Sequence, residues 1–158
     1  MPDYYDTETQ LNEYLVFHYG EDAQVLGWDF GPVKALGFHK RLVGWIDTDR
    51  LRPGSRGLDL GCAVGRITFE LSKFCESVVG IDASKSFVTR ADLIKTSGTI
   101  SFRLTREGSL GTPSEVQLPP NLDRNRVTFL QGDAANPPAS LGEFDVVILA
   151  NLLDRLPQ

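Results

Sequence analysis

The chain has 158 residues, of which 16 are Lys or Arg and 21 are Asp or Glu, so its formal net charge is −5. Hydrophobic residues make up 41% and charged residues 23%, which is the balance of a folded globular protein rather than a disordered one. An acidic chain without a basic cluster argues against nucleic acid as a partner. The longest strongly apolar run, residues 146–150, is too short for a membrane helix.

Cysteine usage and the first residues bear on the cellular compartment. Cys62 and Cys75 are the only cysteines, which makes no disulfide framework. Residues 1–6 lack the basic and apolar parts of a signal peptide. We therefore expect a cytoplasmic protein that neither crosses nor binds a membrane.

Residues 1–56 are rich in aromatic side chains and carry two helical patterns. The first helix is expected to begin near Asp6 or Thr7, either of which can cap it, and to end at Gly20. The second is expected to begin at Pro32. Its apolar face would consist of Ala35, Phe38, Leu42 and Trp45. These patterns predict an N-terminal helical cap over residues 1–56.

From residue 57 onward, apolar strands alternate with helices. The expected strands are 57–61, 77–82, 127–131 and 144–150, and residues 96–125 form an insert read as a hairpin or an extended loop. Continuous apolar strands separated by helices predict a parallel sheet covered on both faces. The fold class is therefore α/β, with residues 57–158 as one cofactor-binding unit.

Acidic residues and glycines follow the ends of three expected strands, at the edge where ligands bind in an open α/β sheet. Asp59 precedes a loop with Gly61 and Gly65, and Asp82 lies 82 − 59 = 23 positions further on. A carboxylate at about that spacing can reach the hydroxyls of a ribose. The nicotinamide-dinucleotide fingerprint G-x-G-x-x-G is broken by Ala63, where a pyrophosphate needs the closest backbone approach.

The pattern D-x-G-x-x-x-G, then an aspartate, then Gly-Asp-Ala resembles S-adenosylmethionine-dependent class I methyltransferases, which have a Rossmann-like sheet. The resemblance implies that S-adenosylmethionine is the cofactor and that one residue set binds it. On the methionine and sulfonium side this set has Asp59, Gly61 and Gly65, and it also includes Cys62 and Ala63 of the same loop. Asp82 and Ala83 would meet the ribose, and Asp133 and Ala134 the adenine. The middle glycine of the usual motif is replaced by Ala63.

A narrower resemblance covers nearly the whole chain. It is carried by YYDTE at 4–8, EYLVFHYG at 13–20, DFGP at 29–32, LDLGCAVGR at 58–66 and ANLLDRL at 150–156. These segments are similar to the 4-mercaptohistidine ring-N-methyltransferases of ovothiol biosynthesis, which occur alone or as the C-terminal domain of 5-histidylcysteine sulfoxide synthase. The resemblance implies methyl transfer to an imidazole nitrogen of a thiohistidine, with a sulfoxide synthase as a possible partner. Another small acceptor, and a cofactor-binding domain without turnover, stay open as alternatives.

No catalytic base is assigned, but three residues are candidates for the acceptor site. Asn151 and Asp154 follow the fourth strand, where acceptors bind in this fold, and Tyr5 lies in the aromatic N-terminal segment. Tyr4, His18 and Tyr19 could complete a lid over cofactor and acceptor. The aromatic residues Tyr14, Phe17, Phe38 and Trp45 are interpreted as packing, and His39 as a surface residue. No metal site is expected.

The length bears on how complete the fold is. The sheet of the methyltransferase family has seven strands, commonly in the order 3-2-1-4-5-7-6, whereas residues 57–158 carry four recognisable ones. We therefore expect a truncated domain that holds the cofactor half. The fourth strand, 144–150, would then expose an apolar edge, which is a site of self-association.

Overall fold

The computed structural model describes residues 7–26, 28, 30–107 and 110–153. Its strands are β1 (Arg56–Leu60), β2 (Ser77–Asp82), β3 (Thr99–Glu107), β4 (Leu110–Gln117), β5 (Val127–Gln131) and β6 (Val146–Ile148). Its α-helices are α1 (Glu8–Tyr19), α2 (Asp22–Leu26), α3 (Phe38–Val43), α4 (Arg66–Leu71) and α5 (Lys85–Ser97). Short 3₁₀ helices η2 (Val33–Ala35), η3 (Thr48–Arg50), η4 (Arg124–Arg126) and η5 (Ala139–Leu141) lie between them.

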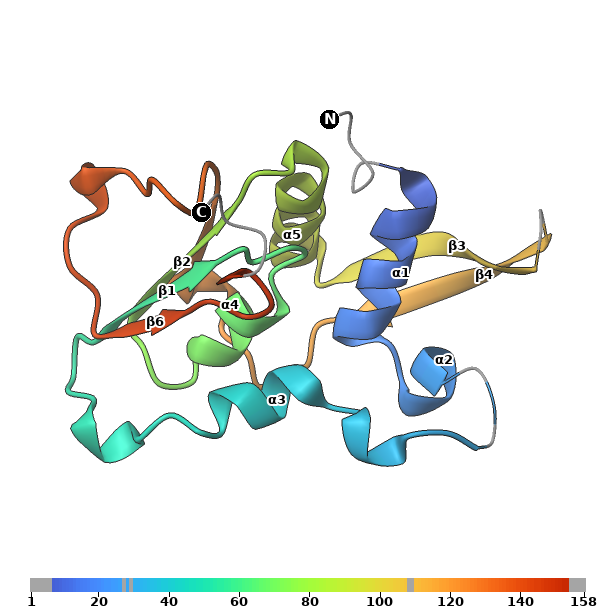
Figure 1. The fold of residues 1–158 in the computed structure, drawn as a ribbon, viewed down its shortest axis with the longest axis horizontal. Helices are drawn as coiled ribbons and strands as arrows, with labels where there is room; N and C mark the ends of the chain where they lie inside the picture. The colour runs from blue at the N-terminus through green and yellow to red at the C-terminus, as the bar shows by residue number, and fades with distance from the viewer. Residues whose placement is uncertain (1–6, 27, 29, 108–109, 154–158) are drawn as a thin grey trace.

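Four strands form a parallel sheet in the order β5-β2-β1-β6. Counted along the chain without the hairpin, this is the 3-2-1-4 order expected from the sequence. Because all four strands run the same way, their carboxyl ends meet at one edge of the sheet. The predicted α/β fold with a Rossmann-like sheet is confirmed (Figure 1).

The two faces of the sheet are covered differently. On one face, α4 and α5 pack over the sheet, and Phe69, Leu71 and Ile94 are almost completely buried. The other face carries a smaller cluster of Leu58, Leu60 and Ile81, packed against side chains of the segment 134–152. Both faces are covered as predicted, but in the described residues the smaller cluster meets no α-helix.

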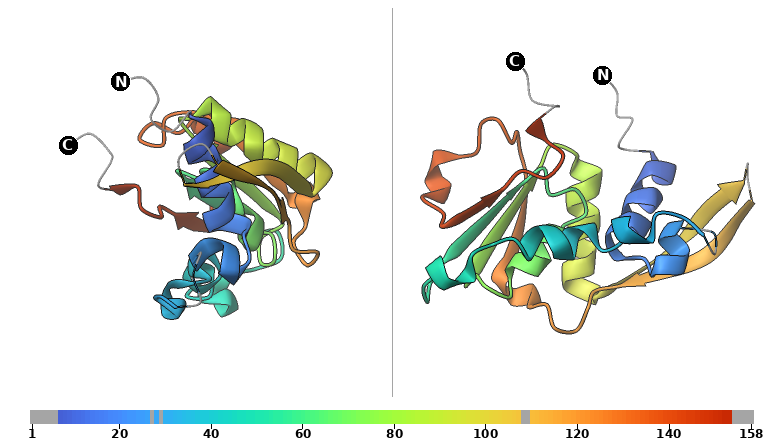
Figure 2. Two further views of the ribbon diagram at one scale, coloured as in Figure 1. Left: turned by 90° about the vertical axis from the view of Figure 1, so that its right-hand side faces the viewer. Right: turned by 60° about the horizontal axis from the view of Figure 1, so that its bottom comes forward.

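The insert is an antiparallel hairpin, β3–β4, which projects away from the parallel sheet beside α1 (Figure 2). Its side chains Ile100, Leu104 and Val116 are buried, so the hairpin contributes to the main core. The Asn12 side-chain amide on α1 donates to the Arg103 carbonyl at 3.0 Å. The hairpin reading of the insert is confirmed, and the hairpin supports α1.

The first N-terminal helix follows the prediction. Thr7 is its N-cap, and the Thr7 hydroxyl accepts from the backbone amide of Gln10 at 3.3 Å. Leu11, Leu15 and Tyr19 are buried in the main core.

The second predicted N-terminal helix is wrong in its continuity and its face. The chain breaks at Gly37, whose φ of +67° begins a new helix, α3. The break turns His39 and Val43 inward, and it leaves Trp45 80% exposed. His39 is therefore not a surface residue, since only 4% of it is exposed.

The last strand is shorter than expected. The sequence predicts 144–150, but only Val146–Ile148 pair, all with β1. Among the described residues β6 has no neighbour on its other side, and Val147 is 48% exposed.

Candidate functional site

A cavity of about 710 Å³ lies at the carboxyl ends of the parallel strands. That volume is typical of a site for a small ligand or cofactor. From the strand ends and the loops after them it is lined by Gly61, Cys62, Ala63, Asp82, Ala83, Ser84, Asp133, Ala134, Ala150, Asn151 and Leu152. Seven of the nine residues predicted to bind the cofactor are in this set.

The loop after β1 turns sharply at two positive φ angles. Gly61 has φ +73° and Ala63 has φ +47°. The amides of Gly61 and Cys62 both donate to the Ile81 carbonyl, at 2.8 and 3.0 Å, which ties the loop to the end of β2. A left-handed backbone costs a residue with a Cβ about 1–2 kcal/mol. Ala63 thus holds a left-handed conformation that favours glycine, the residue of the usual motif at this position.

Asp82 holds this loop in place from the end of β2. Its carboxylate oxygens accept from the backbone amides of Ala63 at 2.8 Å and of Ser84 at 2.9 Å. Asp82 is half-buried and lines the cavity, and the neighbouring Ala83 is exposed there. The carboxylate is therefore fixed in position and faces the space that a ligand would fill.

Asp133 follows β5 and is exposed at the cavity. It accepts from the Asn136 side-chain amide and from the Ala135 backbone amide, both at 2.9 Å. These two hydrogen bonds lower the pKa of Asp133, so the group is an ionised acceptor at neutral pH. Ala134 lies beside it in the cavity lining.

Asp59 and Gly65 were predicted to bind the cofactor, but neither lines the cavity. Asp59 is 1% exposed and points into the core, where its Oδ2 accepts from the Thr68 hydroxyl at 2.7 Å. Burial raises the pKa of Asp59 to about 7, and its Oδ1 has no hydrogen-bond partner among the described residues. Asp59 can therefore influence a ligand only indirectly, through the position of the loop that follows it.

Gly65 is required by packing rather than by ligand approach. Its φ is +85°, and a Cβ built there would lie 2.5 Å from Cζ of Phe129. The close contact lets the start of α4 pack on the ring of β5. The packing requirement is an additional reason for the glycine, and cofactor contact at Gly65 stays a prediction.

Aromatic side chains from α1 and α3 complete the cavity. We call Tyr14, Phe17, His18, Phe38 and His39 the aromatic wall. The imidazoles of His18 and His39 lie 4.1 Å apart between ring centroids, and Phe17 meets His39 edge-on at 5.0 Å. The sequence had indicated the three aromatic residues only as packing. His39 was missed because its place depends on the break at Gly37.

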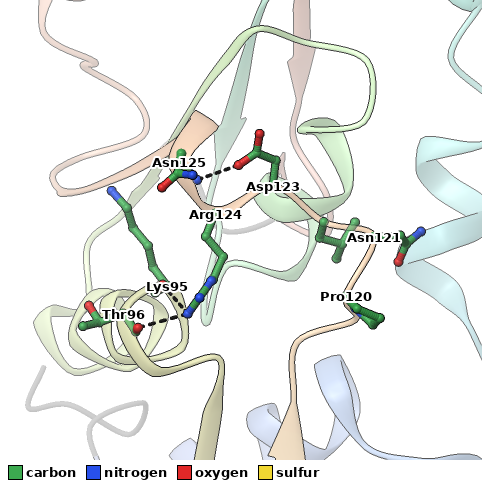
Figure 3. Close-up of a pocket in the computed structure, with 8 residues that line it drawn as sticks. Lys95, Thr96, Pro120, Asn121, Asp123, Arg124 and Asn125 are labelled. Atoms are coloured by element: carbon green, nitrogen blue, oxygen red, sulfur yellow. Dashed lines mark hydrogen bonds between the residues drawn. The ribbon is translucent and has the colours of Figure 1, made fainter.

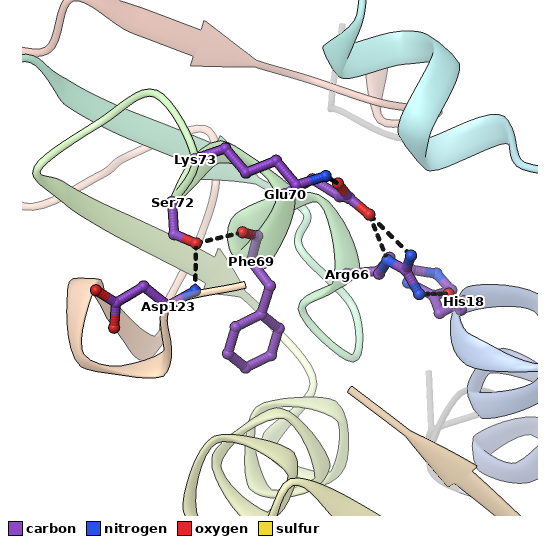
Figure 4. Close-up of polar contacts among 7 residues, drawn as sticks. All are labelled: His18, Arg66, Phe69, Glu70, Ser72, Lys73 and Asp123. Carbon is purple, nitrogen blue, oxygen red and sulfur yellow. Dashed lines mark hydrogen bonds and ion pairs between the residues drawn. The ribbon is translucent and has the colours of Figure 1, made fainter. Parts of the chain in front are cut away.

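An ion network lies beside His18 of the aromatic wall, with Arg66 and Glu70 buried and Lys73 exposed (Figure 4). The Arg66 guanidinium binds the Glu70 carboxylate through two nitrogens, at 2.8 and 3.0 Å, and donates to the His18 carbonyl at 3.0 Å. Lys73 pairs with Glu70 at 2.5 Å. The network therefore carries two positive charges and one negative charge, and it ties α4 to the end of α1.

Burial and Arg66 affect the two imidazoles in the same direction. Burial first, then the nearby His39 and Arg66, hold the pKa of His18 well below its usual range. Burial and Arg66 lower the pKa of His39 to about 4, against the weaker opposing effect of Glu70. Both rings are neutral at neutral pH.

The catalytic candidates divide into described and undescribed residues. Asn151 lines the cavity with φ +53°, a conformation that Asn tolerates better than most residues. Tyr4, Tyr5 and Asp154 lie outside the described residues. Of the other lid candidates, His18 lines the cavity, whereas the Tyr19 hydroxyl is buried and donates to the Val64 carbonyl at 2.7 Å.

Cys62 lines the cavity but is 3% exposed, and burial raises the pKa of its thiol well above the usual value. A thiol in that state is a packing group rather than a nucleophile. Within the described residues no three His, Cys, Asp or Glu side chains gather as a metal site would require. No helix in the described part of the chain has the length and apolar character to span a membrane.

A second, polar cavity of about 570 Å³ lies between the end of α5 and η4 (Figure 3). Arg124 donates there to the carbonyls of Lys95 and Thr96, at 3.1 and 3.0 Å. The guanidinium thus satisfies carbonyls that the last turn of a helix leaves unpaired. This cavity is accounted for by helix capping.

Comparison with known proteins agrees with the strand-end geometry. A family model described as a methyltransferase domain matches residues 58–158. Over 51 residues the chain is 37% identical to a 23S rRNA (uracil(1939)-C(5))-methyltransferase of Erwinia tasmaniensis, a match to 32% of this chain and 11% of that protein.

Two solved structures are also similar. The magnesium protoporphyrin IX methyltransferase of Synechocystis PCC 6803, with SAH bound, matches 90% of this chain and 53% of its own at 21% identity, with a TM-score of 0.54. A glycopeptide N-methyltransferase complexed with sinefungin is 19% identical in sequence, with a TM-score of 0.46. That match covers 96% of this chain and 51% of the glycopeptide N-methyltransferase. The chain thus spans about half the length of these structures.

The family match covers the loop after β1, Asp82 and Asp133 together, in the order that the sequence motifs required. The ovothiol resemblance has no counterpart among these matches and stays a prediction. The chain therefore belongs to the methyltransferase domain family, with the fold and strand-end motifs of an S-adenosylmethionine-dependent class I methyltransferase.

Proposed function

We propose that this chain binds S-adenosylmethionine in the cavity and transfers its methyl group to a small acceptor held against the aromatic wall. The observation that carries the proposal is the placement of Asp82, which is fixed by two loop amides and faces the cavity. As the acceptor we propose an imidazole nitrogen of a thiohistidine. The ovothiol resemblance supports that choice, as does a wall of flat rings that suits a small planar ligand.

The residues of the cavity fit the proposed cofactor. Its ribose hydroxyls can donate to Asp82 and its adenine amino group to Asp133, and both carboxylates line the cavity. A cationic sulfur suits a lining whose charged residues, Asp82 and Asp133, are both acidic. Asp59 is not needed for direct contact.

The chain's own residues mainly orient the reactants. When bound, the cofactor supplies an activated methyl group on a cationic sulfur. The acceptor nitrogen would use its lone pair to form the new N–C bond as the C–S bond breaks and its electron pair goes to sulfur. The positive charge passes to the acceptor ring, which then releases its N–H proton to solvent. The aromatic wall would hold the acceptor ring for this in-line approach. Orientation of this kind is worth up to about 7–11 kcal/mol.

Calorimetric titration with S-adenosylmethionine and S-adenosylhomocysteine tests the cofactor, and mass spectrometry of 4-mercaptohistidine incubated with chain and cofactor tests the acceptor. We expect heat from both titrations and a mass increase of one methyl group on the histidine ring. Cofactor binding with methylation of a different small molecule would reject the acceptor alone. No heat from either titration would reject the enzyme altogether.

A cofactor-binding domain without turnover is the second candidate. The observation that favours it is the span of the match, about half the length of a similar methyltransferase. Heat with S-adenosylmethionine, together with no methylated product from any acceptor offered, would support this reading. Mixing the chain with a 5-histidylcysteine sulfoxide synthase in the same assay tests the proposed partner, since restored turnover would identify it.

A further inference from the structure

We propose that the aromatic wall selects an acceptor in its uncharged form, as a small planar nitrogen heterocycle, and excludes cationic amines and cationic rings. The inference rests on the proposed function and narrows its substrate class. It stands on the imidazole pair, on the buried guanidinium beneath it and on the shape of the wall.

The wall offers flat surfaces and little competition for hydrogen bonds. Phe17 and Phe38 stack at a centroid distance of 6.2 Å, and the two imidazoles meet these rings and each other edge-on or tilted at 4.1–5.6 Å. The Nδ1 atom of His18 is enclosed and has no hydrogen-bond partner among the described residues. A protonated His18 would place an unpaired N–H there, which costs about 1–3 kcal/mol, so the ring stays neutral.

Positive charge lies directly behind this surface. Arg66 is 5% exposed, and its guanidinium contacts the His18 carbonyl and stands over the Tyr19 ring at 5.4 Å. Glu70 offsets one of the two positive charges of Arg66 and Lys73. The same burial and charge that disfavour an imidazolium at His18 and His39 act on an acceptor ring packed against them.

The electrostatic potential at the aromatic wall depends on the charged residues of the elements around it. Helix α4 contributes Arg66, Glu70 and Lys73, and the strand ends contribute Asp82 and Asp133. On α3 the other charged residues, Lys40 and Arg41, are exposed. Asp82 and Asp133 would face bound S-adenosylmethionine, and its sulfonium would repel a second cation, an effect that S-adenosylhomocysteine, a neutral thioether, would not add.

The selection has a chemical consequence for transfer. Only the unprotonated ring has the lone pair that attacks the methyl carbon. A site that rejects the imidazolium therefore binds the nucleophilic form and needs no strong base. This agrees with a wall whose imidazoles are poor bases at neutral pH.

Three probes of similar size test the selection on the full chain, with and without saturating S-adenosylhomocysteine. Imidazole titrates, 1-methylpyrazole is neutral throughout, and 1-methylpyridinium is always cationic. The affinity of imidazole should be about tenfold higher at one pH unit above its own pKa than at one unit below, because its neutral fraction rises by that factor. The affinity of 1-methylpyrazole should stay flat, and 1-methylpyridinium should bind at least tenfold more weakly than 1-methylpyrazole. Ligand-observed NMR measures all three.

Two variants locate the effect and its cause. Phe17→Ala should weaken 1-methylpyrazole at least threefold, whereas Trp45→Ala, an exposed ring outside the cavity, should leave it unchanged. Lys73→Met removes one positive charge from the network. It should reduce the ratio of the affinity for 1-methylpyrazole to that for 1-methylpyridinium about twofold.

Equal binding of 1-methylpyridinium and 1-methylpyrazole, an imidazole affinity that ignores pH, or no binding of any probe would overturn the proposal. A pH slope for 1-methylpyrazole would also overturn it, because a protein group such as Asp59 would then set the dependence. S-adenosylhomocysteine binding, measured separately, shows whether the proposed function itself has failed.

Discussion

At the residue scale, Asp82 both holds the loop after β1 and lines the cavity. One carboxylate fixes the amides of Ala63 and Ser84 and also faces the cavity. Hydrogen bonds to a charged group are worth about 1.5–3 kcal/mol each. Removing this carboxylate should therefore affect both the loop and the ligand.

We expect Asp82→Ala to weaken S-adenosylmethionine binding by about 10–100-fold, which corresponds to that range of free energy. Calorimetry measures the affinity, and urea denaturation measures the free energy of unfolding. Asp123→Ala is the matched control, since Asp123 also accepts a backbone amide, that of Asn125, but lies away from this cavity. If Asp82→Ala lost stability and affinity in equal measure, Asp82 would be structural.

Gly65→Ala tests whether packing alone requires the second loop glycine. The left-handed backbone costs about 1–2 kcal/mol and overpacking against Phe129 about 1–3 kcal/mol, so we expect a loss of roughly 2–5 kcal/mol. Gly98→Ala is the control, because φ there is +81° but the nearest atom to a Cβ is 3.4 Å away. Equal losses in the two variants, by thermal or urea unfolding, would contradict the packing argument.

Asp59 should make stability depend on pH. Its folded pKa of about 7 exceeds the ordinary 3.8, so the folded state binds a proton between these values and the unfolded state does not. This contribution is complete below pH 4 and is lost as pH rises to about 7. His18 and His39 act oppositely, because their lowered pKa values add stability as pH rises toward 6.5.

The difference between Asp59→Asn and the parent chain isolates the aspartate. We expect the variant to gain stability relative to the parent by a few kcal/mol between pH 4 and 8, as urea denaturation at several pH values would show. The exposed substitution Asp49→Asn serves as the control. A difference that stays constant with pH would mean that Asp59 is ionised in the folded protein.

At the element scale, α1 is part of the ligand-binding structure rather than an addition to it. Tyr19 at its end donates to the Val64 carbonyl in the loop after β1, and Arg66 at the start of α4 donates back to the His18 carbonyl. Two hydrogen bonds in opposite directions therefore connect α1 to the loop that lines the cavity and to the start of α4.

Tyr19→Phe should destabilise the protein by about 1–3 kcal/mol, because it leaves the Val64 carbonyl buried without its donor. Hydrogen exchange should show faster opening of residues 61–65. Thr96→Val removes a hydroxyl-to-carbonyl hydrogen bond on exposed α5 and should cost less than 1 kcal/mol. Unchanged exchange in the loop would show that α1 does not hold it.

Whether the sequence predicted an element correctly depends on whether the residues that determine it lie close together in the chain. β2 and β5 were predicted to the residue, since their apolar runs and the polar residues that end them, Asp82 and Gln131, are local signals. The second N-terminal helix was not, because the turn at Gly37 depends on packing of His39 and Val43 against distant elements. The acidic part of the site was therefore predictable from sequence, whereas the imidazole pair depends on tertiary structure.

At the scale of the whole molecule, the order β5-β2-β1-β6 leaves β6 paired on one side only in the described residues. An open strand edge is a template for pairing with another chain. Val147 on this strand is 48% exposed, and Leu149 just after it is 37% exposed. The proposed self-association therefore belongs to this edge.

We expect the 158-residue chain to form dimers or larger species as its concentration rises, and Val147→Lys to shift it toward monomer in sedimentation velocity. Leu93→Lys is the control, since Leu93 is 45% exposed on α5, away from the edge. A chain that stays monomeric at high concentration would contradict the self-association.

The pair of hydrogen bonds between α1 and the cofactor loop also has a thermodynamic consequence. Any molecule that binds the outer surface of α1 and shifts it changes the free energy of the loop conformation that binds cofactor. By linkage the effect is reciprocal, so the cofactor alters the affinity of that molecule by the same factor. A molecule bound to the outer surface of α1 would therefore be coupled to the occupancy of the proposed cofactor cavity.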